Sequence, residues 1–198
     1  MRISRQQVVE NRERLLTVAL TKFREHGFDG IGVADVMKAA GMSLGSFYGY
    51  FDSKEQLVAE VSARAVSGTK DLLGGFLSKD DKKALPGMVD GYLSSGHRDN
   101  LSEGCALAAL GSEITHQPDS VRHGVTTELQ ALFTATARHL PGHTKAEKEN
   151  SAIALMASLV GGLMLARMTD DKKLSDRILK AVGRSIKHSN QPAHADQQ

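Results

Sequence analysis

Residues 28–55 read FDGIGVADVMKAAGMSLGSFYGYFDSKE. Apolar side chains fall where two short crossing helices must contact each other, and Gly41 stands between them, where a tight turn needs a positive φ. We therefore expect one helix over about 33–40 and a second over about 44–50. Two short helices around such a turn form the helix-turn-helix that enters the major groove of DNA. The contacting apolar positions are Val36, Ala40, Met42, Phe47 and Tyr50.

This segment resembles the N-terminal domain of TetR-type transcriptional regulators. The resemblance continues beyond the turn through Tyr48, Phe51 and the run 53–55, which makes it more specific than a lone helix-turn-helix pattern. It implies a sequence-specific regulator of transcription, most commonly a repressor, rather than an enzyme. The matching positions are Asp29, Val33, Asp35, Ala40, Gly41, Ser43, Gly45, Tyr48, Tyr50, Phe51, Ser53, Lys54, Glu55 and Leu57.

The resemblance also implies which residues contact DNA. It assigns Leu44, Gly45 and Ser46 to the end of the second helix that faces the bases, and it assigns Tyr48, Tyr50 and Lys54 to the phosphate side. A serine hydroxyl can donate or accept a hydrogen bond, and a leucine can contact a thymine methyl group. The complete set predicted to bind DNA is Val33, Leu44, Gly45, Ser46, Tyr48, Gly49, Tyr50 and Lys54.

The chain departs from the TetR pattern at Ile31 and Gly32, where a Thr-Ser pair is usual, at Met37, where a small residue is usual, and at three positions that lose a basic side chain or a histidine. Ala34 stands where arginine is frequent, Leu44 where lysine is frequent, and Gly49 where histidine is frequent. Each phosphate contact by a basic side chain adds close to one unit to the salt dependence of DNA binding. We therefore expect a gentler salt dependence and a lower affinity than in related regulators. Arg2, Arg5, Arg12 and Arg14 crowd the N-terminal arm and can lie along phosphates.

Helical spacing dominates the rest of the chain, and no stretch alternates with period two for long enough to predict a strand. The run that starts at Ser53 and includes Gln56 is a capping box, so a long helix begins there. We expect an all-α fold. The other predicted helices cover about 6–26, 85–95, 104–115, 120–139, 146–168 and 174–187.

Polarity rises near Gly74 and again at 79–83, which indicates a linker. We accordingly predict three parts. The first is a helix-turn-helix DNA-binding domain over 1–55, which continues into a linking helix to about 75. The second is a helical effector-binding and dimerisation domain over 76–188. The third is a disordered tail over 189–198.

Residues 152–168 are apolar almost all round the predicted helix and include small residues that let another helix approach closely. Such a helix is either the central core helix of a monomer or part of a dimer interface. In the regulators that the chain resembles, the last two long helices pair with their copies in a partner. This implies a homodimer with an interface at Leu155, Leu159, Gly162, Leu163, Ala166, Leu174, Ile178 and Val182.

The segment 104–113 forms a predicted helix of small residues, which would leave space for a small apolar effector. Cys105 stands at its start, where the helix dipole favours a thiolate, so an electrophilic or thiol-reactive effector is a second possibility. Spacing and the resemblance together place the effector at Met88, Tyr92, Cys105, Leu129, Phe133, Met156 and Val160.

Composition limits the other classes of function. The chain has 198 residues, a net charge of +2 and a single cysteine, which suits a reducing compartment. No apolar run reaches the length of a membrane span, and the N-terminus lacks the apolar stretch of a signal peptide, so we expect a soluble cytoplasmic protein. The histidine spacings do not suit a metal site, and we expect no metal and no cofactor.

Two rival functions remain from the sequence. One is a helical enzyme that uses Cys105 with a histidine, although the chain lacks a phosphate-binding glycine loop and a nucleophile motif. The other is a helical protein-interaction module that no longer binds DNA, which the residues at 34, 44 and 49 favour. Specific binding to an operator separates both from a DNA-binding regulator.

Overall fold

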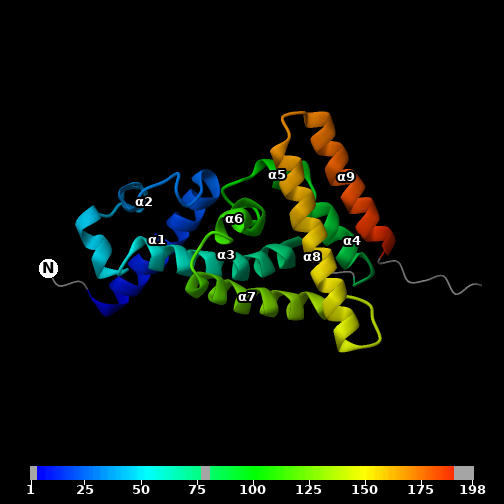
Figure 1. Ribbon diagram of the computed structural model, residues 1–198, viewed down its shortest axis with the longest axis horizontal. Coiled ribbons are helices and arrows are strands. Elements are labelled where there is room, and N and C mark those ends of the chain that lie inside the picture. The colour runs from blue at the N-terminus through cyan, green and yellow to red at the C-terminus, as the bar shows by residue number, and fades with distance from the viewer. Residues whose placement is uncertain (1–3, 77–80, 190–198) are drawn as a thin grey trace, which may run out of the picture. The chain divides into compact units, whose positions relative to one another are not determined.

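The computed structural model describes residues 4–76 and 81–189, and within those ranges it contains helices and no strand (Figure 1). The predicted all-α fold is confirmed. In chain order the elements are α1 (Arg5–His26), α2 (Val33–Ala39), the 3₁₀ helix η1 (Leu44–Gly49), α3 (Lys54–Phe76), α4 (Asp81–Tyr92), α5 (Ser95–Asp99), α6 (Ala106–Ile114), α7 (Asp119–Ala137), α8 (Lys145–Met168) and α9 (Lys172–Ser189).

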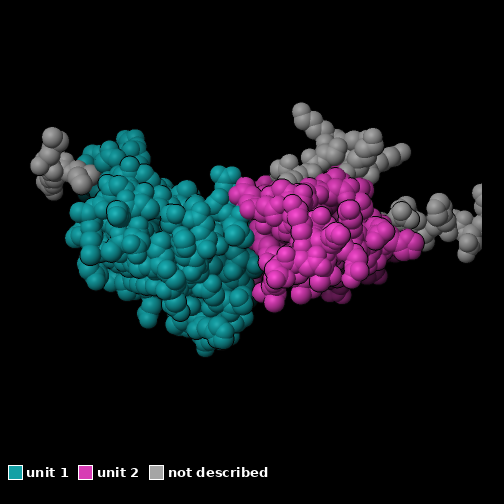
Figure 2. Space-filling model, turned by 90° about the horizontal axis from the view of Figure 1, so that it is seen from above, with its two compact units in different colours: residues 1–68, 101–128 teal, residues 69–100, 129–198 magenta. Residues whose placement is uncertain are grey.

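The chain divides into two compact units (Figure 2). Unit 1 comprises the residues up to Gly68 together with Leu101–Glu128, and unit 2 comprises Thr69–Asn100 together with the residues from Leu129 onwards. Each unit therefore combines two separate stretches of chain, whereas the predicted domains were contiguous. The functional division at 55 and 76 stays a prediction. Ser189 ends α9, and the rest of the predicted tail lies outside the described residues.

The core of unit 1 forms on α1, whose apolar residues recur at helical spacing. The Ser4 hydroxyl caps its N-terminus by accepting a hydrogen bond from the Gln7 amide at 3.1 Å, and Gly27 ends it with φ +76°. Gly41 adopts φ +71° after α2, as the turn requires. The side chains that α1 buries are Leu15, Leu16, Ala19, Leu20 and Phe23.

The predicted third helix forms as a 3₁₀ helix over Leu44–Gly49 rather than as an α-helix. The amide of Ser46 donates to the carbonyl of Ser43 at 3.1 Å, which is the three-residue spacing of a 3₁₀ turn. A segment of six residues that contains two glycines gains too few hydrogen bonds to offset the cost of nucleating an α-helix. Phe47 is only 2% exposed and stacks on Phe51, with 5.8 Å between ring centroids.

The predicted capping box at the start of α3 is formed in part. The Ser53 hydroxyl accepts from the Gln56 amide at 3.1 Å, but the Gln56 side chain accepts from the amide of Asp52, at 2.6 Å, rather than from that of Ser53. The helix continues past the predicted end near Gly74, and α4 already begins at Asp81, so the helices run further into the predicted linker than expected. The helix predicted over 85–95 thus begins four residues earlier, and Pro86 lies inside it.

Helices α8 and α9 pack side by side in unit 2, and α9 also contacts α4 (Figure 1). A Cβ atom at Gly162 would lie 3.0 Å from Cγ1 of Val182, so the glycine permits this close packing. The short helix α5 was not predicted. It is held by Arg98, which is 7% exposed and donates to Asp176 at 2.6 Å and to the Ser175 hydroxyl at 2.9 Å. Polar contacts of this kind leave no periodic signal in the sequence.

Candidate DNA-binding surface and effector cavity

The exposed side of η1 carries four of the residues predicted to contact DNA. Leu44 is 54% exposed and Tyr48 is 75% exposed, although both are large enough to be core residues. Gly45 and Gly49 are also exposed, and a Cβ atom at either position would meet no atom within 4 Å. The buried Phe47 anchors η1, so this open surface faces outward from unit 1.

The hydroxyl of Ser46 has a more restricted role than the sequence indicated. It donates to the carbonyl of Ser43 at 2.7 Å, so its proton is used within the turn and its lone pairs remain available as acceptors. Val33 and Lys54 are the first residues of α2 and α3, and both side chains are half-buried. Helix N-termini favour contact with phosphate oxygens.

Tyr50 is half-buried and held by α1. Its hydroxyl accepts from the Asn11 side-chain amide at 3.1 Å, and its carbonyl accepts from Nε of Arg12 at 3.4 Å. The Arg12 guanidinium also lies 4.6 Å from the centroid of the Phe51 ring and pairs with Glu60 at 2.5 Å. Arg12, which was predicted to lie along phosphates, is therefore engaged inside unit 1. The Tyr50 phenol positions η1 on α1.

Helix α6 contacts the end of α1 through two polar links that the sequence did not reveal. The carboxylate of Glu113 accepts a hydrogen bond from the Phe28 amide at 2.6 Å, and the Arg24 guanidinium donates to the Ser102 carbonyl at 3.1 Å. Both links lie within unit 1. They tie α6 and the residues before it to the turn that precedes the helix-turn-helix.

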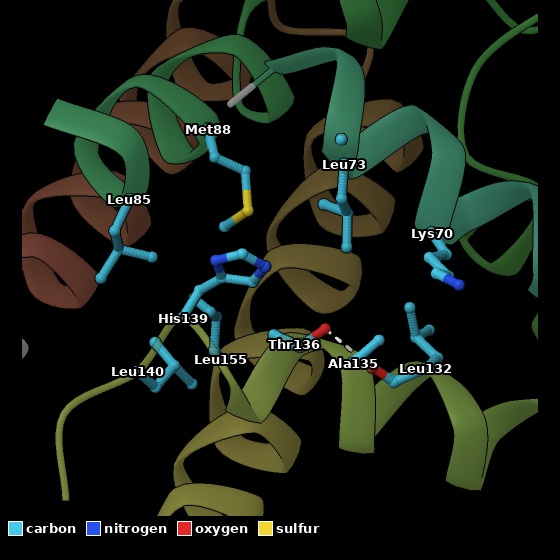
Figure 3. A pocket seen from close by; sticks show the side chains of 11 residues that line it. Lys70, Leu73, Leu85, Met88, Leu132, Ala135, Thr136, His139, Leu140 and Leu155 are labelled. Carbon is cyan, nitrogen blue, oxygen red and sulfur yellow. Dashed lines mark hydrogen bonds between the residues drawn. The ribbon is translucent and has the colours of Figure 1, made fainter. Parts of the chain in front are cut away.

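Unit 2 contains a cavity of about 170 Å³ between α3, α4, α7 and α8 (Figure 3). Its lining is mostly apolar, and Figure 3 shows the side chains of His139 and Met88 pointing toward one another. The Thr136 hydroxyl donates to the Leu132 carbonyl at 2.9 Å, so its proton is not available to a ligand in the cavity. A small apolar molecule suits such a space. The lining residues are Lys70, Leu73, Gly74, Leu85, Met88, Leu132, Ala135, Thr136, His139, Leu140 and Leu155.

Of the residues predicted to bind the effector, only Met88 lines this cavity. Tyr92 and Met156 are buried in the core, and the cavity is lined instead by Leu155, the residue before Met156. Helical periodicity identifies which side of a helix is internal, but a change of one residue turns the side chain by about 100°. The other predicted residues that do not line the cavity are Cys105, Leu129, Phe133 and Val160.

Cys105 is a separate case. It is the N-cap residue of α6, is 1% exposed and belongs to unit 1, whereas the cavity lies in unit 2. A thiol-reactive compound needs access to the sulfur atom, and this conformation covers it. The structure therefore does not support Cys105 as part of the effector cavity.

The predicted dimer interface also needs correction on α8. Five of its residues are buried within the protomer itself, so they cannot contact a partner. The opposite face of α8 is exposed and apolar, whereas on α9 the predicted residues remain partly exposed. Because α8 is apolar all round, its sequence could not show which face is covered internally. The buried residues of α8 are Leu155, Leu159, Gly162, Leu163 and Ala166. The opposite face carries the exposed Ile153, Ala157, Leu165 and Met168 and the half-buried Gly161. The partly exposed residues of α9 are Leu174, Ile178 and Val182.

By length and composition, α8 is long and apolar enough to cross a membrane. The core helix of a globular protein meets the same criteria, and 39% of the apolar window in α8 is buried inside the protein. Packing of one face against the protomer accounts for much of the apolar character of α8. This length and composition are therefore weak evidence for a membrane span.

Comparison with known proteins agrees with the helix-turn-helix geometry. The family model of bacterial regulatory proteins, tetR family, matches residues 15–61, and the model of the tetracyclin repressor-like C-terminal domain matches residues 82–182. The chain is 45% identical over 183 residues to YdgC of Bacillus subtilis strain 168, an uncharacterized HTH-type transcriptional regulator, covering 88% of this chain and 91% of YdgC.

A second relative is the HTH-type transcriptional repressor KstR2 of Rhodococcus jostii, which is 46% identical over 126 residues and covers 62% of this chain and 59% of KstR2. Among solved structures, the reduced form of NemR from E. coli superimposes with a TM-score of 0.76 at 20% identity, covering 93% of this chain and all of NemR, which shows the shared fold. The chain therefore belongs to the TetR family of bacterial regulatory proteins and is a DNA-binding transcriptional regulator.

Proposed function

We propose that this regulator is a cytoplasmic homodimeric repressor that binds a palindromic operator through η1 and leaves it when a small apolar molecule fills the cavity of unit 2. The observation that carries the proposal is the exposure of Leu44 and Tyr48 on a helix whose only buried residue is Phe47. Both residues lie in the segment that the tetR family model matches, on the exposed side of the helix-turn-helix, which supports a role in contacting DNA.

The chemistry of η1 suits the major groove. Leu44 can contact a thymine methyl group, the Ser46 lone pairs can accept from a base amino group, and the Tyr48 hydroxyl can donate to a phosphate. The open space above Gly45 and Gly49 allows the DNA backbone to approach closely. Because η1 contains no charged residue, its contribution to DNA affinity comes from contacts to bases rather than from charge attraction to phosphates.

A palindromic operator requires two copies of η1 about 34 Å apart, one helical turn of DNA. The exposed apolar face of α8, together with Leu174 on α9, supplies a surface for a second copy of the chain. Two identical faces that contact each other around a two-fold axis match the symmetry of the operator. The partner therefore covers Ile153, Gly161 and Leu165 of α8.

Release of DNA requires that the effector bind one conformation of the dimer better than the other. A preference of on the order of 1–3 kcal/mol changes operator affinity by about 5–150-fold. Helices α3 and α7 each contribute residues to both units, and both also line the cavity. A ligand that displaces Leu73 or Leu132 thus acts on helices that extend into the DNA-binding unit.

Tyr48→Ala is expected to weaken operator binding by about tenfold or more, because one hydrogen bond to a charged phosphate is lost. Fluorescence anisotropy with DNA from immediately upstream of the protein's own gene, at two salt concentrations and with non-specific competitor, measures this loss. Leu101→Ala, which removes an exposed side chain of unit 1 outside the helix-turn-helix, should bind like the wild type. Equal affinity of Tyr48→Ala and wild type for the operator would contradict the proposal.

Ala135→Phe is expected to fill the cavity and abolish its ligand binding. Indole, a small apolar aromatic molecule, is the probe, and it should raise the thermal unfolding midpoint of the wild type by mass action. The matched control is Ala131→Phe, which makes the same substitution at an exposed position of α7. If indole stabilises Ala135→Phe as much as the wild type, the cavity is not the binding site.

A further inference from the structure

The cavity of unit 2 has a buried apolar interior and an opening that carries two basic side chains. Leu73, Met88 and Leu132 are buried, whereas Lys70 and His139 line the same cavity and are exposed. Lys70 lies on α3 and His139 in the turn that follows α7, so they reach the cavity from different parts of the chain (Figure 3). We call these two residues the basic mouth. The proposed function uses the apolar interior and gives the basic mouth no role.

The basic mouth has no acidic partner among the side chains that the structure describes. Neither side chain forms a hydrogen bond or an ion pair with them, and none of the described residues that line the cavity is an aspartate or a glutamate. Asp71 follows Lys70 in α3, but it lies about 100° further around the helix and does not line the cavity. The mouth therefore presents positive charge to a ligand.

His139 supplies a hydrogen-bond donor whatever its protonation state. A neutral imidazole carries one N–H group, and a protonated imidazole carries two. The backbone amide of His139 donates to the Thr136 carbonyl at 3.1 Å, which holds the turn, and the ring points toward Met88 (Figure 3). Because the Thr136 hydroxyl already donates to the Leu132 carbonyl, the described side-chain donors that remain for a ligand are those of the basic mouth.

This arrangement favours an amphipathic ligand with a single carboxylate. The apolar part of such a ligand gains free energy by leaving water for the interior of the cavity. Its carboxylate accepts a charge-assisted hydrogen bond at the opening, where it also keeps contact with water. A cationic head group would be repelled by Lys70. Phosphate and sulfate groups are bound best by the paired N–H groups of arginine, and no described residue that lines the cavity is an arginine.

We infer that the cavity binds a small apolar carboxylate, with its hydrocarbon part among Leu73, Met88 and Leu132 and its carboxylate at the basic mouth. His139 donates a hydrogen bond to the carboxylate, and the Lys70 ammonium group adds a favourable charge interaction. The inference names the chemical class of the effector, and it rests on the proposed function in taking the cavity as the effector site. A neutral apolar molecule would use the interior alone.

The test compares phenylacetate with phenylacetamide, which has nearly the same shape but no charge. Isothermal titration calorimetry on the whole chain measures both dissociation constants, and their ratio is the readout. A variant that only loosens the cavity weakens both ligands together and leaves this ratio unchanged. The wild type should bind phenylacetate about tenfold more tightly than phenylacetamide, the usual effect of one hydrogen bond to a charged group.

Substitutions at the basic mouth should change this ratio. His139→Leu should abolish the preference for phenylacetate, because it removes the donor, whereas His139→Gln keeps an N–H group and should retain part of it. Lys70→Gln should reduce the preference roughly two- to fivefold, since its charge is exposed to solvent. The matched controls are His143→Leu and Lys180→Gln, which are exposed in unit 2 outside the cavity lining and should keep the wild-type ratio.

Three results would overturn the inference: no binding of phenylacetate, equal affinity of the wild type for the two ligands, or a wild-type ratio in His139→Leu. The indole experiment with Ala135→Phe separates this inference from the proposed function. If indole stabilises the wild type but not Ala135→Phe, and phenylacetate is not preferred, the cavity binds neutral molecules and this inference alone fails. If Ala135→Phe binds phenylacetate as tightly as the wild type does, the site lies elsewhere and both fail.

Discussion

Replacing Gly161 by leucine is expected to separate the proposed dimer into protomers and to weaken operator binding by about 10²–10⁴-fold, the usual gain from engaging two sites at once. A Cβ atom at Gly161 would meet no atom of its own chain within 4 Å, so the protomer does not require glycine there. A leucine side chain at this position would instead hold the α8 helix of a partner away. Analytical sedimentation and anisotropy with operator DNA measure the two effects.

The neighbouring glycine provides a matched comparison. Gly162→Leu places its side chain against Val182, whose Cγ1 would lie 3.0 Å from the new Cβ, and overpacking of this kind costs about 1–3 kcal/mol. We expect this variant to lose helix packing within unit 2, which near-ultraviolet circular dichroism and thermal unfolding would detect. If Gly161→Leu remains dimeric at micromolar concentration, the exposed face of α8 is not the interface.

Gly27→Ala is expected to destabilise the protein by roughly 3 kcal/mol, because two costs add. Gly27 adopts φ +76° and ψ 173°, a region of backbone space that is essentially limited to glycine and costs other residues about 1–3 kcal/mol. A Cβ atom there would also lie 2.6 Å from a carboxylate oxygen of Glu113. Displacing this carboxylate removes its hydrogen bond to the Phe28 amide, worth about 1.5–3 kcal/mol.

Thermal unfolding measures this effect, and the midpoint should fall by about 6–12 °C for a chain of this size. Gly41→Ala is the control, because Gly41 has φ +71° but open space where the Cβ would stand, so it reports backbone strain alone. Glu113→Gln keeps an oxygen that can accept from Phe28 and should lose less. If Glu113→Gln and Gly27→Ala both keep the wild-type unfolding midpoint, the contact of Glu113 with Phe28 contributes nothing to stability.

The DNA-binding element follows from residues that lie close together in sequence. The positive φ of Gly41, the burial of Phe47 and the cap by the Ser53 hydroxyl each depend on a few neighbouring residues, and each was predicted correctly. The type of the third helix was predicted wrongly, because it forms a 3₁₀ helix. The free-energy difference between a 3₁₀ helix and an α-helix in so short a segment depends on small differences in hydrogen bonding.

The cavity, the exposed face of α8 and the engagement of Arg12 could not be read from local pattern. Leu132 and Phe133 look alike in the sequence, but only Leu132 lines the cavity. The sequence indicated that Arg12 could bind phosphates, but in the structure it pairs with Glu60, which lies 48 residues later in the chain. The local spacing of apolar residues and glycines determines backbone turns, whereas gaps between helices and the pairing of charges arise only when distant segments meet.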